Sequence, residues 1–367
     1  MEQAIDFIPG HLLGSKSGGL GLNKFLKSKS IEYIVTDDKD GAGCELDKHL
    51  PTADIVISQP FYPAYLTAAR IASAPRLKLA ITAGIGSDHV DLAAAMARGI
   101  DVVEVTGCNS ISVAEHEVMA LLALVHNFVP SHRIACEGGW DIAECSARAY
   151  DVEGMDVGTI GAGRIGLAVM RRLKPFGVKL HYFDQHRLTA SVEAELGCVY
   201  HESPAALARA CDAVMLNCPL HPGTERMFDG KMLASMRRGA YIVNNARGKL
   251  MDTEAVAAAL RSGQLAGYAG DVWYPQPAVP DHPWRTMPNQ GMTPHISGTT
   301  LSAQARYAAG VREILECHLE GRPIRDEYYI VKNGKLAGAG AVAYKEGNTT
   351  GGSEKLGRDG EAAGRRK

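Results

Sequence analysis

The stretch "VGTIGAGRIG", residues 157–166, decides the fold of this 367-residue chain. It joins a β-type run to a helical pattern through three glycines, Gly161, Gly163 and Gly166. Gly161 allows a tight turn, Gly163 lets backbone amides approach a pyrophosphate, and Gly166 lets the helix pack closely on the strand. A glycine pattern of this kind also occurs in ordinary turns, so its surroundings decide between the two interpretations.

The surroundings favour a dinucleotide site. Arg164 and Ile165 supply backbone amides at the start of the helix, and Asp184 ends the next β-type run, eighteen residues past Gly166. A carboxylate at that place accepts hydrogen bonds from ribose hydroxyls and repels the extra phosphate of NADP. We therefore expect NAD as the cofactor. His186 and Arg187 follow closely enough to hold a phosphate in some loop conformations, so strict exclusion of NADP does not follow from the sequence.

Short β-type runs alternate with helical patterns on both sides of this loop, which predicts parallel βαβ units. The first series begins with "IEYIVT", residues 31–36, and the second with "MDVGTIG", residues 155–161. Between them, the apolar residues 110–129 predict one long helix that is buried on most sides.

The predicted fold class is α/β, with two Rossmann-like, doubly wound parallel-sheet domains. Residues 1–110 and 297–335 would form a substrate domain from both chain ends, and residues 111–296 the NAD-binding domain. Residues 336–367 are rich in glycine and charge, which predicts an extended tail.

Composition argues against several classes of protein. A net charge of −2 gives no electrostatic footprint for nucleic acid or an anionic membrane. No apolar run approaches the roughly 20 residues that cross a bilayer, and no leader pattern begins the chain, so we expect a cytoplasmic protein. The eight cysteines lack the spacing of a metal site. We expect reduced thiols and no metal.

Polar side chains follow three successive strand-like runs of the second series. Arg247 follows "AYIVNNA", Asp271 ends "AGYAGD", and His295 stands in "MTPHISG". Each alone would more often be a surface or capping residue, but three at strand ends beside a nucleotide loop favour an active site. Gln276 stands nineteen residues before His295, where we would expect a carboxylate partner.

Several longer motifs carry a resemblance to a known family. They include "ISQPFYPAYL", "TAGIGSDHVDL", "CNSISVAEH", "NNARGKL", "PQPAVPDHPWRTMP" and "MTPHISGTT". With these motifs the chain resembles NAD-dependent formate dehydrogenase, a branch of the D-2-hydroxyacid dehydrogenase superfamily, from about residue 4 to the tail. The resemblance implies a homodimer built through helices of the NAD-binding domain. It also implies a first strand of the substrate domain that this chain lacks.

The resemblance further implies formate as substrate and assigns roles to residues. Arg247 and Asn109 would bind the formate carboxylate, with the Ile85 amide as a further donor, and Gln276 would hold His295. The substrate-binding residues would be Ile85, Asn109, Arg247, Pro60, Phe61 and Ser297. The cofactor-binding residues outside the glycine loop would be Asp184, Pro219, His221, Asn245, Ala246, Arg247, Asp271, His295, Ser297 and Gly298.

Simpler interpretations stay open for some of these residues. Asp271 and Ser297 would serve equally as strand-end caps, and Pro60 and Phe61 as packing residues. Cys108 and Cys218 lie beside the predicted site; we interpret them as packing residues, because hydride transfer needs no nucleophile.

Two rival functions share this fold. A 2-hydroxyacid dehydrogenase must remove a hydroxyl proton and pairs its histidine with a carboxylate, so Gln276 argues against it. An inactive nucleotide-binding scaffold could lose the arginine and the histidine, but Arg247 and His295 are both present. Formate has no hydroxyl proton, so a neutral partner for His295 suits the transfer of a hydride alone.

Overall fold

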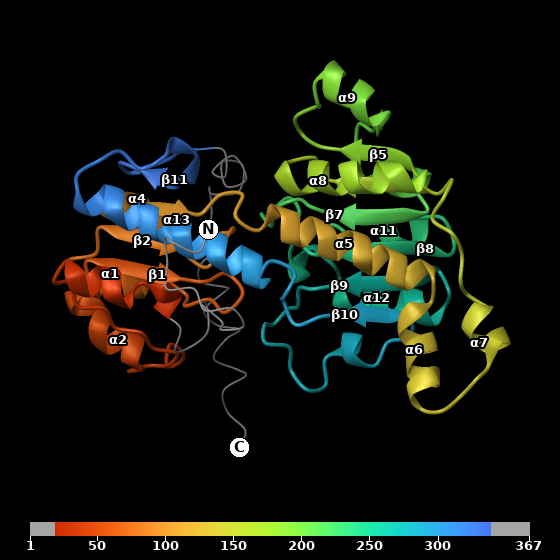
Figure 1. The fold of residues 1–367 in the computed structure, drawn as a ribbon, viewed down its shortest axis with the longest axis horizontal. Coiled ribbons are helices and arrows are strands. Elements are labelled where there is room, and N and C mark those ends of the chain that lie inside the picture. Colours follow the sequence, from red (N-terminus) through yellow and green to blue (C-terminus); the bar gives the residue numbers. More distant parts are fainter. Residues whose placement is uncertain (1–18, 339–367) are drawn as a thin grey trace. The chain divides into compact units, whose positions relative to one another are not determined.

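The computed structural model describes residues 19–338, which form two compact units (Figure 1). The larger unit is Ser110–Ser297, and the smaller combines residues 19–109 and 298–338. The units meet after residues 109 and 297, and the sequence analysis placed these junctions after residues 110 and 296. Most of the predicted tail, residues 339–367, lies outside the described residues. The first residue of the predicted tail, Leu336, belongs to the short strand β12 (Lys335–Leu336).

The larger unit contains a seven-stranded sheet in which every pairing is parallel. Its strand order is β10-β9-β8-β7-β4-β5-β6. The strands are β4 (Asp156–Ile160), β5 (Lys179–Phe183), β6 (Val199–Tyr200), β7 (Ala213–Leu216), β8 (Ala240–Asn244), β9 (Leu265–Gly270) and β10 (Gln290–Met292). The order reverses between β4 and β7, and ligands of open α/β sheets bind at the carboxyl ends of the strands near such a reversal.

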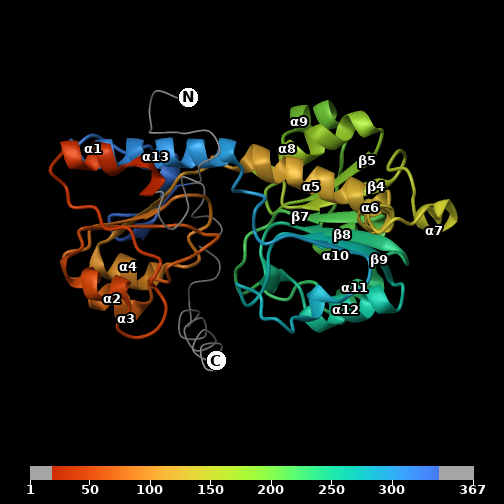
Figure 2. The same cartoon turned by 60° about the horizontal axis from the view of Figure 1, so that its bottom comes forward.

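Helices cover both faces of this sheet (Figure 2). The helices of this unit are α5 (Ser110–Val125), α6 (Phe128–Cys136), α7 (Ile142–Ser146), α8 (Arg164–Leu173), α9 (Ala190–Leu196), α10 (Pro204–Ala210), α11 (Gly230–Ser235) and α12 (Thr253–Arg261), with 3-10 turns η3 (Lys174–Phe176), η4 (Gly248–Leu250) and η5 (Pro283–Arg285). Along β7, Ala213 and Met215 face the core under α5 and α8, whereas Val214 and Leu216 face the core under α10 to α12. Burial on both faces explains the continuous apolar runs of these strands.

The predicted helix over 110–129 is wrong in its extent. The helix α5 ends at Val125, Asn127 takes a left-handed φ of 52°, and α6 begins at Phe128. Among the described residues no single helix is long and apolar enough to cross a membrane, although α5 and α6 pass that test as a pair bent by 69°.

The smaller unit contains a five-stranded sheet of order β1-β2-β3-β11-β12. Its elements are η1 (Gly19–Gly21), α1 (Asn23–Ser28), α2 (Glu45–His49), η2 (Leu50–Thr52), β1 (Ile55–Ser58), α3 (Ala68–Ala72), β2 (Leu79–Thr82), α4 (Leu92–Arg98), β3 (Asp101–Glu104), α13 (Leu301–Leu319), η6 (Asp326–Tyr328), β11 (Tyr329–Lys332) and β12 (Lys335–Leu336). Strands β1 to β3 are parallel, but β11 and β12 pair antiparallel. The α/β class is confirmed, while this sheet is mixed and not parallel throughout as predicted.

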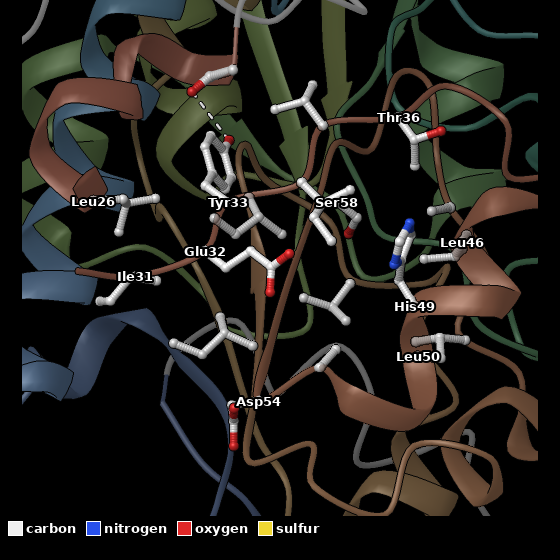
Figure 3. A pocket seen from close by; sticks show the side chains of 18 of the residues that line it. Leu26, Ile31, Glu32, Tyr33, Thr36, Leu46, His49, Leu50, Asp54 and Ser58 are labelled. Carbon is white, nitrogen blue, oxygen red and sulfur yellow. Dashed lines mark hydrogen bonds between the residues drawn. The ribbon is translucent and has the colours of Figure 1, made fainter. Parts of the chain in front are cut away.

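Residues 31–36, predicted as a strand, form no strand in the structure. The strand β1 is therefore the edge strand of the sheet. Figure 3 shows side chains of both where they line a pocket among the described residues, Tyr33 and Thr36 of the segment and Ser58 of β1. A β-type sequence becomes a strand only when a neighbouring strand lies within hydrogen-bonding reach. Here no described strand pairs with it.

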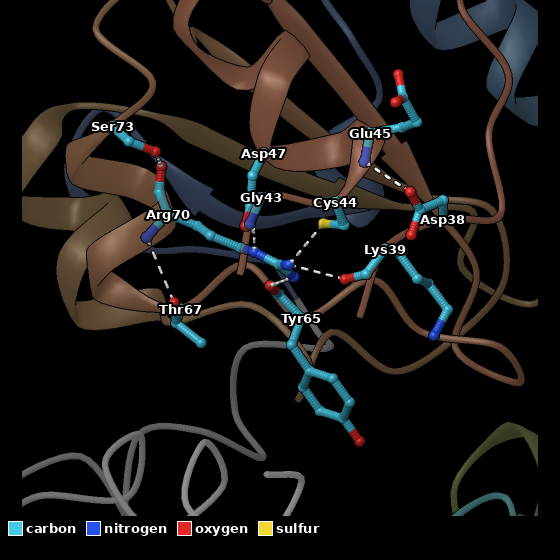
Figure 4. A network of polar contacts seen from close by, with 10 residues as sticks. All are labelled: Asp38, Lys39, Gly43, Cys44, Glu45, Asp47, Tyr65, Thr67, Arg70 and Ser73. Atoms are coloured by element: carbon cyan, nitrogen blue, oxygen red, sulfur yellow. Dashed lines mark hydrogen bonds and ion pairs between the residues drawn. The ribbon is translucent and has the colours of Figure 1, made fainter. Parts of the chain in front are cut away.

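A network around Arg70 holds the segment that follows (Figure 4). From α3, Arg70 Nε donates to Asp47 Oδ1 at 2.8 Å, and its two terminal nitrogens donate to the carbonyl oxygens of Tyr65 at 2.9 Å and Lys39 at 2.7 Å. The planar guanidinium reaches three acceptors at once, which a lysine cannot do. It therefore fixes the loop before α2, and α2 itself, against α3.

Candidate active site

The glycine loop has the geometry that a pyrophosphate site requires. Gly161 has a φ of 96°, and a Cβ there would lie 2.5 Å from the carbonyl oxygen of Asn217. A Cβ on Gly166 would lie 2.0 Å from the carbonyl oxygen of Gly161, so only glycine lets α8 approach β4. At Gly163 a Cβ would meet no protein atom within 4 Å, and no side chain caps α8. The amides at the start of α8 thus face space that an anion can enter.

Asp184 lies beside this loop, at the end of β5. Its Oδ2 accepts a hydrogen bond from the Ala162 amide at 2.7 Å and its Oδ1 one from the His186 amide at 2.8 Å. Each carboxylate oxygen can accept a further bond, so both ribose hydroxyls can still be received. Arg187, considered as a phosphate ligand, instead donates to Glu193 at 2.8 and 3.1 Å. This pairing favours NAD over NADP.

Asp271 holds the loop that carries His295. The aspartate is fully buried after β9. It accepts from Thr293 Oγ1 at 2.6 Å and from the backbone amides of Ile296 and Ser297 at 2.7 and 2.6 Å. His295 lies between these bonds with a φ of 57°, which costs a non-glycine residue about 1–2 kcal/mol. Asp271 offsets that cost. One acceptor position on its Oδ2 is left for a ligand, which makes a hydrogen bond to nicotinamide possible. That contact stays a prediction.

Gln276 contacts His295 directly. Its Nε2 lies 2.6 Å from His295 Nδ1. An amide N–H that donates to Nδ1 leaves the ring proton on Nε2. The ring is therefore oriented without a carboxylate that would favour its protonated form.

The loop after β8 contributes Asn245, Ala246 and Arg247. Arg247 is half-buried and donates from Nη1 to the carbonyl oxygen of Ala246 at 2.8 Å. The Asn244 side chain holds this loop, because it donates to the carbonyl oxygen of Arg247 at 3.0 Å and accepts from the Ala246 amide at 3.1 Å. A guanidinium cation thus stands at the carboxyl end of β8, where it can bind a carboxylate.

Sequence reasoning missed His116, which links three parts of the larger unit. Asn245 Nδ2 lies 3.0 Å from His116 Nδ1, and His116 Nε2 lies 3.2 Å from Thr293 Oγ1. Thr293 donates to Asp271, so it accepts a hydrogen bond from His116 Nε2. His116 Nδ1 then accepts from the Asn245 amide, and the ring is the neutral tautomer with its proton on Nε2. Burial lowers the pKa of His116, which supports this neutral form.

Glu117, the next residue of α5, was also missed. It is fully buried, and burial raises its pKa to about 8. Asn217 Nδ2 donates to Glu117 Oε2 at 3.1 Å and to Thr159 Oγ1 at 3.0 Å, and Thr159 in turn donates to the carbonyl oxygen of Gly161. Glu117 is therefore linked to the glycine loop through the side chains of Asn217 and Thr159. Two polar residues, His116 and Glu117, in the middle of an apolar helix were the signal that could have found them.

Other predicted residues of the larger unit take ordinary structural places. Pro219 and His221 lie in the loop after β7, where His221 Nδ1 accepts from the Gly223 amide at 3.2 Å. Ser297 is buried at the end of the His295 loop. Burial raises the pKa of the Cys218 thiol to about 12, so it stays protonated, as a packing residue does.

The smaller unit brings its predicted residues to the carboxyl ends of its parallel strands. Pro60 and Phe61 follow β1, Ile85 follows β2, and Asn109 follows β3. Gly84 has a φ of 150°, and a Cβ there would lie 2.8 Å from the Pro60 ring.

Asn109 has a buried side-chain amide whose oxygen can still accept a hydrogen bond. Its Oδ1 has no hydrogen-bond partner among the described residues. A Cβ on Gly298 would lie 2.6 Å from Asn109 Nδ2, so glycine is needed beside this amide. Phe61 packs against Tyr307 of α13 at 5.9 Å between ring centroids, and burial raises the pKa of the nearby Cys108 thiol to about 12.

Comparison with known proteins places the chain in a family. Residues 118–297 match the model described as D-isomer specific 2-hydroxyacid dehydrogenase, NAD binding domain. The chain is 65% identical to a formate dehydrogenase of Pseudomonas sp. (strain 101) over 352 residues, which cover 96% of this chain and 88% of that protein. The chain belongs to the formate dehydrogenase family. This family is a branch of the D-2-hydroxyacid dehydrogenase superfamily.

Two solved structures of the family resemble this fold. A formate dehydrogenase named for Granulicella m. superposes with a TM-score of 0.89 at 62% identity, covering 91% of this chain and 89% of that one. The NAD-dependent formate dehydrogenase of Staphylococcus aureus, solved in complex with NAD, gives 0.81 at 46% identity, covering 89% and 97%. These comparisons support NAD as the cofactor.

Proposed function

We propose that the protein oxidises formate to carbon dioxide and transfers the hydride directly to NAD. Family membership supports the reaction, and one contact favours formate over a hydroxyacid: the amide of Gln276 lies 2.6 Å from His295 Nδ1. A hydroxyacid must lose a hydroxyl proton to a base, and a carboxylate partner would tune the histidine for that task. Formate loses only a hydride from carbon.

The nicotinamide ring supplies the chemistry by accepting the hydride. The residues of this chain bind and orient the reactants. Arg247 matches two carboxylate oxygens with its planar fork, and in the smaller unit the Ile85 amide and the Asn109 side chain are proposed as further donors to formate. Carbon dioxide is neutral and linear, so a single cationic anchor binds formate without a strong hold on the product.

We also propose specific roles for the groups around the cofactor. The amides at the start of α8 receive the pyrophosphate, and Asp184 receives the ribose. Asp271 fixes the His295 loop and keeps one acceptor position for the carboxamide of nicotinamide. Orientation of this kind supplies much of the rate enhancement of a step that needs no acid or base.

Initial rates of NADH formation from formate, glycerate and lactate test the proposal. Turnover of formate with NAD, slower turnover with NADP, and none with the two hydroxyacids are expected. The variant Arg247→Ala should lower kcat/KM for formate by about a hundredfold or more. Turnover of glycerate or lactate in place of formate would support a hydroxyacid dehydrogenase. Binding of NAD without any turnover would support a scaffold.

We propose in addition that the protein is a cytoplasmic homodimer. Large apolar side chains are exposed on α6, on α7 and before α7: Phe128 is 59% exposed, Trp140 88% and Ile142 69%. A second copy that covers this surface would remove them from water. Light scattering should give twice the chain mass, and Trp140→Asp should shift it toward the monomer. A monomer at every concentration would contradict the dimer, and recovery in a membrane or organelle fraction would contradict the location.

A further inference from the structure

Glu117 is a buried carboxyl group that the proposed reaction does not use. It lies on α5, which packs against α8 in the larger unit (Figure 1). Its side chain is fully buried. Among the described residues its Oε2 accepts one hydrogen bond, from Asn217 Nδ2 at 3.1 Å, and its Oε1 has no hydrogen-bond partner. A buried carboxylate needs a cation or several donors, so this environment disfavours the ionised form.

Among residues 19–338, no charged side chain faces Glu117 from the elements around it. The helices α6 and α8 pack against α5, and their charged side chains are exposed or paired with other groups: His132, Arg133, Arg164, Arg171 and Arg172. The strands β8, β9 and β10 contribute only Tyr241 and Tyr268, which stay neutral because burial raises their pKa. On α5 itself, Glu115 is exposed and His116 is neutral. Burial therefore raises the pKa of Glu117 to about 8, and no cation opposes this.

One side chain joins Glu117 to the glycine loop. Asn217 Nδ2 donates to Glu117 Oε2 and, at 3.0 Å, to Thr159 Oγ1, and Thr159 donates to the carbonyl oxygen of Gly161 at 3.1 Å. A Cβ on Gly161 would lie 2.5 Å from the Asn217 carbonyl oxygen, so the backbone of Asn217 contacts the first glycine of the loop. The position of Asn217 is thus set from one side by Glu117 and felt on the other side by the loop.

The glycine loop is the part of the site that receives negative charge. NAD brings a pyrophosphate, and the amides at the start of α8 face the space that it can enter. A negative charge buried on α5 would repel the pyrophosphate through protein, where screening by water and salt is weak. A protonated carboxyl has no net charge and does not repel it.

We propose that Glu117 is a positioning residue of the NAD site, and that NAD binds tightly only while this carboxyl keeps its proton. The neutral carboxyl accepts from Asn217 and so holds the residue that supports Gly161. When the carboxyl ionises, the affinity for NAD falls by about tenfold or more. Because the two equilibria are linked, bound NAD also makes the proton harder to remove. The inference rests on the proposed place of the pyrophosphate and not on formate oxidation.

Calorimetric titration of the full chain with NAD, without formate, tests this between pH 6.5 and pH 9.5. The dissociation constant of the parent should rise by about tenfold or more across this range, with the bend near pH 8. Glu117→Gln should lack this rise, because its amide oxygen still accepts from Asn217 and the group cannot ionise. Glu115→Gln is the matched control and should follow the parent, because Glu115 lies on the same helix with its side chain 63% exposed.

Proton uptake is a second readout, and a merely structural defect would not change it in this way. Titrations at pH 8.5 in buffers of different ionisation enthalpy give the number of protons taken up with each NAD. A tenfold linkage moves the pKa of Glu117 by about one unit. The parent should therefore take up about half a proton more than Glu117→Gln.

Glu117→Leu separates the hydrogen bond from the charge. Leucine fits an apolar surrounding but leaves the Asn217 amide without its acceptor. At pH 7 we expect NAD to bind to Glu117→Leu at least about threefold more weakly than to Glu117→Gln. Equal affinity of the two variants would overturn the positioning role.

Parallel pH profiles for the parent and Glu117→Gln, or equal proton uptake by both at pH 8.5, would overturn the proposed link between the proton and NAD. Formate turnover by the same samples is measured alongside. An absence of turnover together with the expected link would contradict only the proposed reaction, because NAD binding is measured without formate.

Discussion

At the scale of single residues, the neutral partner of His295 is the feature that separates formate chemistry from hydroxyacid chemistry. Replacing Gln276 with Glu would place a carboxylate beside Nδ1 and favour the protonated imidazole. Because a cationic ring changes the electrostatics beside the formate anchor, we expect Gln276→Glu to narrow the pH range of formate oxidation. The measurement is kcat/KM for formate against pH. Superimposable profiles for the variant and the parent would show that the proposed role of Gln276 is wrong.

Buried Glu117 gives a second prediction at this scale. Its pKa is about 8 in the folded chain, against an ordinary value of 4.5. The folded state therefore holds a proton that the unfolded state has lost between these two values, and stability falls as pH rises through that window. The variant Glu117→Gln keeps the shape without the proton equilibrium. Its gain in unfolding free energy should grow from pH 4.5 to pH 8 and reach about 3 kcal/mol at pH 7.

Thermal unfolding at several pH values checks the Glu117 prediction. Glu115→Gln serves as control, because Glu115 lies on the same helix with its side chain 63% exposed. It should leave the pH dependence unchanged. A gain from Glu117→Gln that does not vary with pH would contradict burial as the cause.

Some of these residues could be predicted from the sequence and others could not. Asp184 and the three glycines follow from a strand, loop and helix that are consecutive in the chain. The bonds that Asp271 makes to Ile296 and Ser297, and the contact of His116 with Thr293, join segments far apart in sequence. No local pattern specifies such pairings, so the spacing of the strands singled out Asp271 but did not predict the hydrogen bonds that it accepts from Ile296 and Ser297.

At the scale of elements, the strand β4, its loop and α8 form one unit that a conservative substitution can test. A methyl group at Gly163 meets no protein atom within 4 Å, and the φ of −72° suits alanine. Gly163→Ala should therefore leave thermal stability within about 0.5 kcal/mol of the parent. It should weaken NAD binding by about tenfold or more, because the added methyl lies where the pyrophosphate approaches.

Gly230→Ala is the control for Gly163→Ala. Its Cβ would meet only the Cβ of Ala255, at 3.9 Å in ordinary contact, far along the chain from the loop. Calorimetric titration with NAD measures the affinity of both variants. Parental affinity in Gly163→Ala would mean that the pyrophosphate does not approach this glycine.

The same scale shows where sequence patterns fail. The β-type run 31–36 matches a strand in composition but has no described strand beside it, since strand formation depends on a partner. The apolar run 110–129 matches one helix, yet the left-handed backbone of Asn127 divides it. Burial explains the apolar character of α5 but not that of α6, which has no buried residue, and it does not fix where either helix ends.

At the scale of the whole molecule, the alternation of strands and helices was sufficient to predict the α/β class. The antiparallel pairing of β11 and β12 was not predicted, because these short strands follow α13 without a βαβ pattern. The activity belongs to this scale as well, because residues of both units are assigned to it. Only rates of formate oxidation measured on the intact chain can test those assignments together.

Oxidation of deuterated formate by the intact chain tests whether the hydride passes directly from formate to NAD. We expect that deuterium moves from formate to the nicotinamide, that one carbon dioxide is released for each reduced cofactor formed, and that the rate falls on deuteration when hydride transfer limits it. Reduced cofactor without deuterium, or no reduced cofactor from formate under conditions where lactate or glycerate is oxidised, would contradict it.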